Sequence, residues 1–421
     1  MIKRKKFFSN TIMLYIMALA QNLLPMLTFP YLTRKLEPDL YAVITYMTAV
    51  ISYVRVFLKF GFELSSTKQI AESRNDKEVI GKILGTTIQS NMLLAIISLF
   101  VYSAMILSID IMRNYILLSY LYLIGVYLEI FLPDFLFMGL EKMQSITMRF
   151  IVTKVFTTVM TFVLVRTKAD ILWIPILNIM GNILAVILVW IQIFTKLKLK
   201  VAFSTFKDCI QMLRSSSVYF LSKFATTAFG VTNTFMMGIV NLPPEQISFW
   251  GVSYNLINSA LSLYSPIVNS LYPHMVKKKD QRLIKQILLI MEPVIVAVTI
   301  ITFLFSSQII TVFCGSKYTG AIPVFRTLLP VLIFAFPAQI IGFPVLGTIG
   351  MVNETTKSTI ISSIFHVTGL ILLIIFGRFT IINIAALRCC TEAMLFCIRG
   401  YYLYTYRRTI KNFRGSYGKT N

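Results

Sequence analysis

Two basic residues lie within a stretch of sequence that is otherwise apolar enough to cross a membrane. Arg55 and Lys59 stand four residues apart between residues 40 and 62, so both project from one face of the predicted helix. A charge at bilayer depth costs roughly 2.5–3.5 kcal/mol on insertion scales, so such residues face protein or a watery cavity. Lys59 is close enough to the helix end to reach the interface instead. Arg55 is nearer the middle, and we expect it to line an internal cavity that receives an anionic group.

Two lysines in other apolar stretches extend this pattern. Lys154 and Lys223 fall in the fifth and seventh predicted spans and, like Arg55, lie slightly to the cytoplasmic side of their helix midpoints. Each lysine alone could form a structural ion pair or extend to the interface. Cations at a similar depth would instead form a positive ring that is open to the cytoplasmic leaflet. We therefore predict a substrate-binding set made of Arg55, Lys59, Lys154 and Lys223.

Two acidic residues lie at membrane depth in the fourth predicted span. Glu129 is near its middle, and Asp134 follows about one turn later. One interpretation is that these acids neutralise Arg55 or Lys154, because charges in lipid are usually paired. The other is that one of them titrates and couples transport to an ion gradient.

The last two-fifths of the chain carry further polar and helix-bending signals. Arg388 and Glu392 stand four apart in the last span, which predicts an ion pair within one helix. Arg399, one to two turns later, is expected to extend its side chain to the interface. Four prolines recur every seven residues in and around the tenth span, where they predict bending of that helix: Pro323, Pro330, Pro337 and Pro344.

The composition places all these residues in an all-α, polytopic membrane protein. The chain has 421 residues, of which 57% are hydrophobic and 14% charged, with a mean hydropathy of +0.76. A soluble fold of this length cannot bury so much apolar surface, and long apolar runs without two-residue alternation favour helices over a barrel. We expect twelve spans at about 10–32, 40–62, 83–109, 115–139, 148–166, 171–195, 216–240, 247–273, 284–312, 321–347, 356–377 and 380–404.

The net charge of +23 is concentrated in short connections between apolar runs. Lysine and arginine are about three times as frequent on the side of the N-terminus as on the other side, which predicts that both termini are cytoplasmic. This distribution is typical of orientation signals rather than of a nucleic-acid-binding surface. We expect no nucleic acid among the partners of the chain.

The spans divide into two predicted lobes of six helices around a central cavity. We expect an N-lobe at 1–195, a linker at 196–215, a C-lobe at 216–404 and a basic cytoplasmic tail at 405–421. The linker has apolar residues at helical spacing beside basic ones, which predicts a short amphipathic helix on the cytoplasmic surface. Similar Pro-and-acid helix starts at residues 36–39 and 242–245 favour two lobes with parallel topology.

Catalytic and metal-binding signals are weak throughout the sequence. The five cysteines form no CxxC pair, and the sequence has only two histidines. His274 lies at a predicted cytoplasmic helix end, and His366 lies inside the eleventh span. Motifs of hydrolases, nucleotide-binding loops and zinc proteases are missing, and no long outer loop could hold an active site. We therefore expect a protein that is not an enzyme and that needs no cofactor or metal.

Several short motifs stand out in the first seventy residues and at the end of the eighth span: Asn22-Leu23-Leu24-Pro25, Phe29-Pro30-Tyr31-Leu32-Thr33-Arg34, Phe60-Gly61-Phe62, Ser66-Thr67-Lys68-Gln69-Ile70-Ala71 and Leu271-Tyr272-Pro273. They resemble the Wzx-type polysaccharide flippases of the multidrug/oligosaccharidyl-lipid/polysaccharide (MOP) exporter superfamily. Glu37-Pro38 and Tyr41-Ala42 stand where the family usually has a Gly-Pro pair and a Tyr-Gly pair, which would alter a turn. The resemblance implies a flippase that moves an undecaprenyl-pyrophosphate-linked oligosaccharide across the bacterial plasma membrane. A cationic cavity would suit that headgroup.

Two alternatives remain open from the sequence. A drug or other lipid-linked precursor exporter of the same superfamily would have the same layout, although acids rather than cations would dominate a drug-binding cavity. A membrane glycan polymerase or acyltransferase would need a large outer loop or a His/Asp centre. The expected partners are the lipid-linked oligosaccharide and membrane lipids, with the polysaccharide polymerase machinery as a further candidate.

Overall fold

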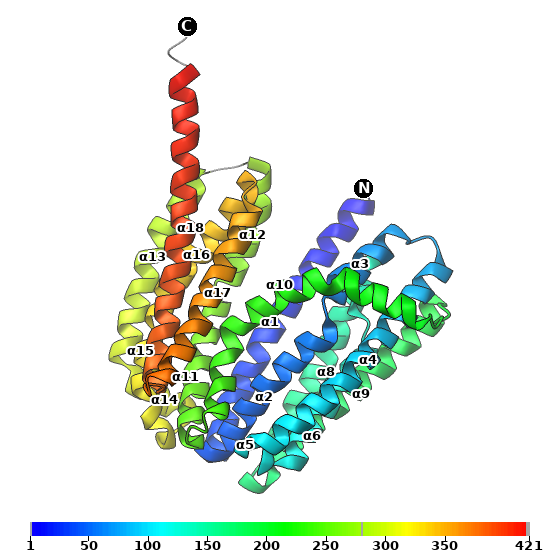
Figure 1. The fold of residues 1–421 in the computed structure, drawn as a ribbon, viewed down its shortest axis with the longest axis horizontal. Coiled ribbons are helices and arrows are strands. Elements are labelled where there is room, and N and C mark those ends of the chain that lie inside the picture. The colour runs from blue at the N-terminus through cyan, green and yellow to red at the C-terminus, as the bar shows by residue number, and fades with distance from the viewer. Residues whose placement is uncertain (1, 279–280, 418–421) are drawn as a thin grey trace. The chain divides into compact units, whose positions relative to one another are not determined.

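The computed structural model describes residues 2–278 and 281–417, and within them it contains helices and connecting segments but no strand. The predicted all-α class is thereby confirmed. The chain divides into two compact units, Met1–Ser248 and Phe249–Asn421, which are described separately below (Figure 1). The division falls within helix α11 (Pro244–Ser262) rather than in the predicted linker.

Arg55, Glu129 and Lys154 all lie in the first unit, on α2, η1 and α8. The elements of this unit are α1 (Ile2–Lys35), α2 (Pro38–Lys59), α3 (Phe62–Glu72), α4 (Lys77–Ser108), α5 (Asp110–Arg113), α6 (Ile116–Leu128), η1 (Glu129–Phe131), α7 (Asp134–Gly139), α8 (Met143–Leu164), η2 (Lys168–Leu172), α9 (Trp173–Ile191), the π-helix η3 (Gln192–Leu197) and α10 (Phe206–Ile239). In this unit α2, α4 and α10 pack against one another (Figure 1).

A break in the chain between α2 and α3 coincides with the Phe60-Gly61-Phe62 motif. Phe60 and Gly61 both adopt left-handed backbone conformations, with φ of 38° and 75°. A Cβ on Gly61 would come within 2.6 Å of Tyr219 Cβ and 2.9 Å of the Ser216 carbonyl oxygen on α10. Glycine is therefore required here by the backbone conformation and by the close approach of α10.

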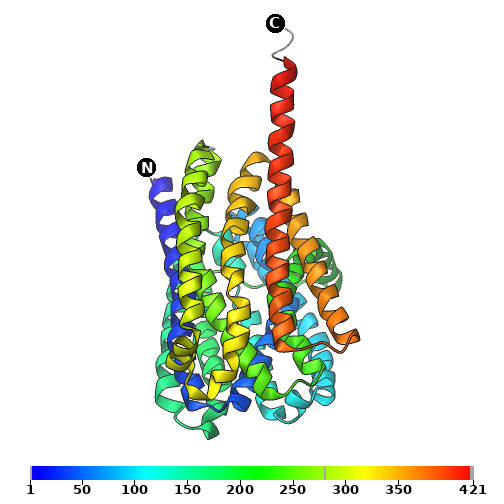
Figure 2. The same ribbon diagram turned by 90° about the vertical axis from the view of Figure 1, so that its left-hand side faces the viewer.

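The second unit contains α12 (Ser265–Lys278), α13 (Gln281–Leu304), α14 (Ser306–Cys314), η4 (Ser316–Ala321), α15 (Ile322–Leu328), α16 (Pro330–Ile340), the π-helix η5 (Ile341–Leu346), η6 (Gly347–Ile349), α17 (Val352–Ile375) and α18 (Ile381–Tyr417). Helix α18 extends well past the other helices of this unit, so the predicted basic tail continues the last helix through Tyr417 (Figure 2).

Nine helices among the described residues are long and apolar enough to cross a membrane. They correspond to predicted spans two to six and nine to twelve, while the first, seventh and eighth predicted spans are not among them. The fourth span is interrupted, because α6 ends at Leu128 and Pro133 separates η1 from α7. The protein is a multi-pass membrane protein, and the count of twelve stays a prediction.

The linker between the sixth and seventh predicted spans differs from the surface helix that its sequence predicts. Residues 198–205 form neither helix nor strand, and the helix that begins at Phe206 continues to Ile239 as a single element. This non-helical segment lies against α4, where a Cβ on Gly81 or Gly85 would come within 2.0 Å of the carbonyl oxygens of Lys200 and Ala202. The GxxxG spacing of these glycines lets two backbones meet, as small residues do in membrane helix packing.

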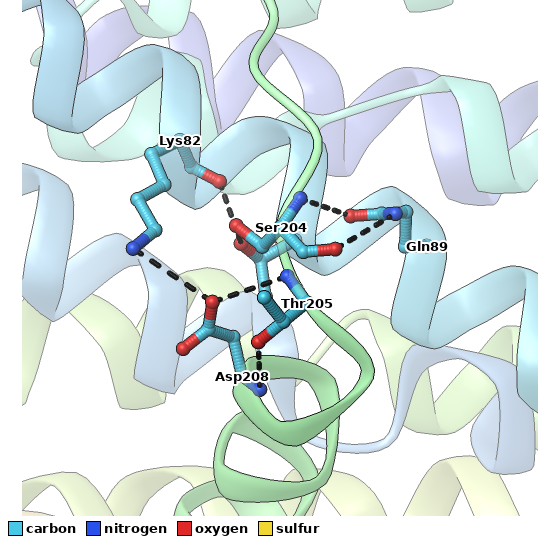
Figure 3. Close-up of polar contacts among 6 residues, drawn as sticks. Lys82, Gln89, Ser204, Thr205 and Asp208 are labelled. Carbon is cyan, nitrogen blue, oxygen red and sulfur yellow. Dashed lines mark hydrogen bonds and ion pairs between the residues drawn. The ribbon is translucent and has the colours of Figure 1, made fainter.

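Polar contacts fix the end of this segment to α4 (Figure 3). The Ser204 N–H donates to Gln89 Oε1 at 2.8 Å, and Gln89 Nε2 donates to the Ser204 carbonyl at 3.3 Å. Thr205 caps α10 in a reciprocal capping box with Asp208, which also lies 3.8 Å from Lys82 Nζ. Hydrogen bonds from the Thr205 hydroxyl and backbone N–H hold the pKa of the Asp208 carboxyl below its ordinary value.

The tenth predicted span is broken into α15, α16, η5 and η6, as its prolines predict. Pro330 stands in the first turn of α16, Pro337 lies inside that helix, and Pro344 lies in the π-helix. At Gly342 the backbone leaves helical geometry, with ψ of −120°. The Ala338 carbonyl accepts from the Ile341 N–H at the end of α16, and it also receives a side chain.

That side chain is Arg399, so its expected extension to the membrane interface is wrong. Arg399 is 8% exposed, and its Nη1 donates to the Ala338 carbonyl at 2.6 Å. Its Nε and Nη2 donate to the hydroxyls of Ser358 and Thr359 on α17, each at 3.2 Å. The guanidinium therefore joins α16, α17 and α18 through these three hydrogen bonds.

Candidate functional site

Arg55 and Glu129 form an ion pair in the first unit. Arg55 projects from α2 about one turn before the helix ends at Lys59, and Glu129 lies where α6 tightens into the 3₁₀ turn η1. Arg55 Nε donates to both carboxylate oxygens of Glu129 at 3.1 and 2.9 Å, and Nη2 donates to Oε1 at 2.8 Å. The side chains remain 41% and 22% exposed, so the pair is accessible rather than sealed in a core.

Two lysines add positive charge around this pair. Lys59 and Lys154 both interact electrostatically with Glu129, and Lys154 also interacts with Arg55. Arg55 thus bonds the carboxylate directly, and the charges of Lys59 and Lys154 act on it electrostatically, which leaves a local excess of positive charge. Arg55 Nη1 is not among the atoms that bond Glu129. This arrangement can attract and hold a multiply charged anion such as a diphosphate.

A small polar pocket extends from Lys154 between α1, α8 and α9. Its volume is about 140 Å³, and its lining residues are Leu24, Pro25, Thr28, Leu32, Lys154, Thr157, Thr158, Thr161, Ile174, Leu177 and Asn178. Thr157 and Thr161 donate their hydroxyl hydrogens to carbonyls of their own helix at 3.0 and 2.7 Å. Their oxygens keep lone pairs, so the pocket offers hydrogen-bond acceptors beside a lysine.

Lys223 lies on α10 with an exposed side chain, beside a row of aromatic residues that packs α10 against α2. Phe60, directly after α2, stacks on Phe220 at 4.5 Å between ring centroids, and Tyr53 of α2 meets Phe224 at 5.7 Å. Because this packing is apolar and extensive, α10 belongs to the same compact unit as α2. The participation of Lys223 in the anion site stays a prediction.

Asp134 pairs with a residue that the sequence did not suggest. Arg149 Nη2 donates to Asp134 Oδ1 at 2.7 Å, which ties the start of α7 to the second turn of α8. Asp134 is therefore engaged with Arg149 rather than with Arg55 or Lys154. Only Glu129 of the two acids contacts the cationic cluster.

The second unit holds an acid that the sequence reasoning overlooked. Glu292 lies in the middle of α13 and lines a groove of about 990 Å³ whose walls are mostly apolar. Its Oε2 is buried, and within the described part of the chain no hydrogen-bond donor reaches it. An acid in the middle of an apolar span is a functional candidate by default, and that signal was present in the sequence.

The same unit contains the expected ion pair on the last helix. Arg388 Nη1 lies 2.5 Å from Glu392 Oε2, and both side chains are almost fully buried. In the described residues, no group of three or more histidine, cysteine or acidic side chains is placed to hold a metal ion.

Comparison with known protein families decides the family of the chain. Residues 7–279 match the family model described as "Polysaccharide biosynthesis protein", which covers well over half of the sequence. The chain belongs to the polysaccharide biosynthesis protein family. This confirms the resemblance that the N-terminal motifs suggested.

Two relatives of this polysaccharide biosynthesis protein share its length. It is 24% identical over 404 residues to a protein of Escherichia coli (strain K12) named "Putative O-antigen transporter", covering 93% of this chain and 96% of the relative. It is 25% identical over 271 residues to a protein of the same name from Shigella dysenteriae, covering 64% and 67%.

Solved structures of the MOP superfamily share its fold. The lipid II flippase MurJ in its inward closed conformation gives a TM-score of 0.71 at 14% identity, covering 94% of this chain and 87% of that one. A multidrug resistance MATE family transporter in an inward-facing conformation gives 0.68 at 12% identity, covering 96% and 99%. At these identities the likeness concerns the fold alone.

Proposed function

We propose that this polysaccharide biosynthesis protein is a flippase for an undecaprenyl-pyrophosphate-linked oligosaccharide in the bacterial plasma membrane. It is a transporter rather than an enzyme, in keeping with its family and with relatives named as O-antigen transporters. The observation that carries the proposal is the cluster of Arg55, Lys59 and Lys154 around the single acid Glu129. The diphosphate is the part of the substrate that would need such an excess of positive charge at membrane depth.

In this proposal the headgroup binds in the first unit while the polyprenyl chain stays in lipid. Arg55 supplies a planar fork for two phosphate oxygens, and Lys154 supplies a second cation at the mouth of the threonine-lined pocket. Glu129 holds Arg55 in place between transport cycles and exchanges part of its contact for phosphate when substrate arrives. The pocket's hydroxyl oxygens would accept hydrogen bonds from the first sugar.

Movement of the substrate by alternating access is part of the same proposal. The bent tenth span supports it, because the π-helix η5 and its prolines leave a segment with fewer backbone hydrogen bonds to constrain it. Both termini are proposed to be cytoplasmic, so the cationic cluster would first be reached from the inner leaflet. A drug exporter of the same fold is disfavoured, because basic side chains outnumber acids in the cluster.

The proposal is tested by complementation of a strain whose chromosomal copy of the gene has been deleted. Lys154→Ala should abolish most surface glycan and cause lipid-linked repeat units to accumulate in the membrane at normal protein level. Lys200→Ala, an exposed cation outside the cluster, is the matched control and should support full export. Normal glycan with Lys154→Ala would remove this residue from the site, and normal glycan in the deletion strain itself would refute the function.

A further inference from the structure

A second polar groove in the first unit lies apart from the anion site, between the first turns of α8 and the end of α9. Its volume is about 530 Å³. The polar part of its lining comes from Gln144, Ser145, Arg149, Gln192, Thr195 and Lys196. Gln192 Nε2 donates to the Ser145 hydroxyl at 2.7 Å, so the two sides of the groove are joined by a hydrogen bond.

Arg149 gives this groove a buried cation with unused hydrogen-bonding capacity. The residue is 9% exposed, and its Nη2 donates to Asp134. Its Nη1 is buried and has no hydrogen-bond partner in the described part of the chain. Because this nitrogen is enclosed by the protein, Arg149 reaches the groove through other atoms of its side chain, and its positive charge favours an anion there.

The remaining walls of the groove are apolar and face outward. Met148 and Val152 on α8 are 54% and 48% exposed, and Leu188 and Ile191 on α9 are 39% and 55% exposed. On helices that span a membrane, exposed apolar side chains of this kind face lipid. The groove thus combines a basic floor near one end of the two helices with apolar walls that continue toward the middle of the membrane.

The backbone at this place also favours an anion. Helix α8 begins at Met143 without a side-chain cap, so the positive end of its dipole lies at the groove. Helix α9 changes into the π-helix η3 at Gln192, which places both Gln192 and Lys196 in the lining. Arg149, Lys196 and the start of α8 contribute positive charge here, and Asp134 contributes one negative charge. The net local charge is therefore positive.

We propose that this groove binds the phosphate of an anionic glycerophospholipid, with the acyl chains lying along the apolar walls of α8 and α9. Lys196 and Arg149 contact the phosphate, and Gln192 and Gln144 bind the glycerol headgroup. With the N-terminus in the cytoplasm, the lipid belongs to the inner leaflet. The proposal does not depend on the transported substrate, because the groove does not include Arg55, Glu129 or Lys154.

The test measures lipid binding to the purified full-length protein by native mass spectrometry after titration with phosphatidylglycerol or phosphatidylcholine. The unaltered protein should retain phosphatidylglycerol at about tenfold lower concentration than phosphatidylcholine, as one charge-assisted contact allows. Lys196→Ala combined with Gln192→Ala should weaken phosphatidylglycerol binding at least fivefold and leave phosphatidylcholine binding unchanged. Lys200→Ala, an exposed lysine outside the groove, should change neither.

A second variant separates loss of the site from loss of folding. Arg149→Gln with Asp134→Asn removes both charges of the buried pair together, so no charge is stranded, and it should reduce phosphatidylglycerol binding to a similar extent. Equal binding of the two lipids by the unaltered protein would overturn the proposal, as would unchanged phosphatidylglycerol binding in both variants. Displacement of the lipid by an equal concentration of glycerol phosphate would show that free phosphate, rather than lipid, is recognised.

Discussion

Replacement of Arg55 by alanine distinguishes two roles for this residue: partner in a structural ion pair, or contact for the substrate. The change removes three hydrogen bonds to Glu129, of 3.1, 2.9 and 2.8 Å. Stranding a fully buried charge costs about 3–5 kcal/mol, whereas an exposed pair contributes about 0–1 kcal/mol. The pair is 41% and 22% exposed, and Lys59 and Lys154 still balance Glu129 after the change. We therefore expect a loss of about 1–2 kcal/mol in the free energy of unfolding.

The double variant Arg55→Ala with Glu129→Gln should recover most of that stability, because no acid is left without its partner. Export of glycan should stay defective in the double variant if Arg55 binds the substrate. Arg55→Ala with Asp134→Asn is the matched control and should recover nothing, because Asp134 is bound to Arg149 and its loss strands a second residue. Arg55→Lys should restore export only in part, since lysine lacks the planar fork.

The assay combines thermal unfolding of the purified variants with surface glycan and protein level in the deletion strain. Recovery of both stability and export in the Arg55/Glu129 double variant would refute a substrate-binding role, because a phosphate site cannot be repaired by removal of an acid. Loss of export at normal stability would support the role. A fall of stability well beyond 2 kcal/mol in Arg55→Ala would show that the magnitude argued from partial exposure is wrong.

Three further predictions concern the linker, its cap and the orientation of the chain. Gly85→Ala should lower the thermal unfolding temperature and protein level, because its Cβ would meet the Ala202 carbonyl at 2.0 Å; an unchanged unfolding temperature would contradict this packing. The lowered pKa of Asp208 means that its capping contribution is complete above the unfolded value of about 3.9 and is lost as pH falls through the folded pKa. The difference in unfolding temperature between the parent and Asp208→Asn should therefore stay constant from about pH 8 to 5. Reporter fusions should place both termini in the cytoplasm, and an external C-terminus would contradict the charge bias.

The charged residues of the first unit could be recognised from the sequence, but their partners could not. A basic residue inside an apolar run can be recognised from the sequence alone, and Arg55 and Lys154 are two such residues. Whether Glu129 or Asp134 faces Arg55 depends on the 3₁₀ turn and Pro133, which turn the two acids in different directions. Arg388 and Glu392 were paired correctly because both lie on one helix, where spacing alone fixes proximity.

The remaining differences arise where the backbone departs from regular helix. Arg399 fits beside the Ala338 carbonyl because Gly342 leaves room for it: a Cβ there would come within 2.8 Å of Arg399 Nη1. No residue pattern around Arg399 itself reveals that acceptor. The linker was expected to form a separate surface helix because its apolar residues have helical spacing. Residues 198–205 are instead non-helical and pack on Gly81 and Gly85. The need for small residues at those two positions cannot be recognised until the facing segment is known.

The central claim is that cations of the first unit hold the diphosphate of a lipid-linked substrate. The most direct measurement is the affinity of the purified protein for a polyprenyl diphosphate and for the matching uncharged polyprenol. We predict that the diphosphate binds at least tenfold more tightly, and that Lys154→Ala and Arg55→Ala each remove most of this preference without changing binding of the alcohol. Equal affinity for the two lipids, or an undiminished preference in both variants, would contradict the claim.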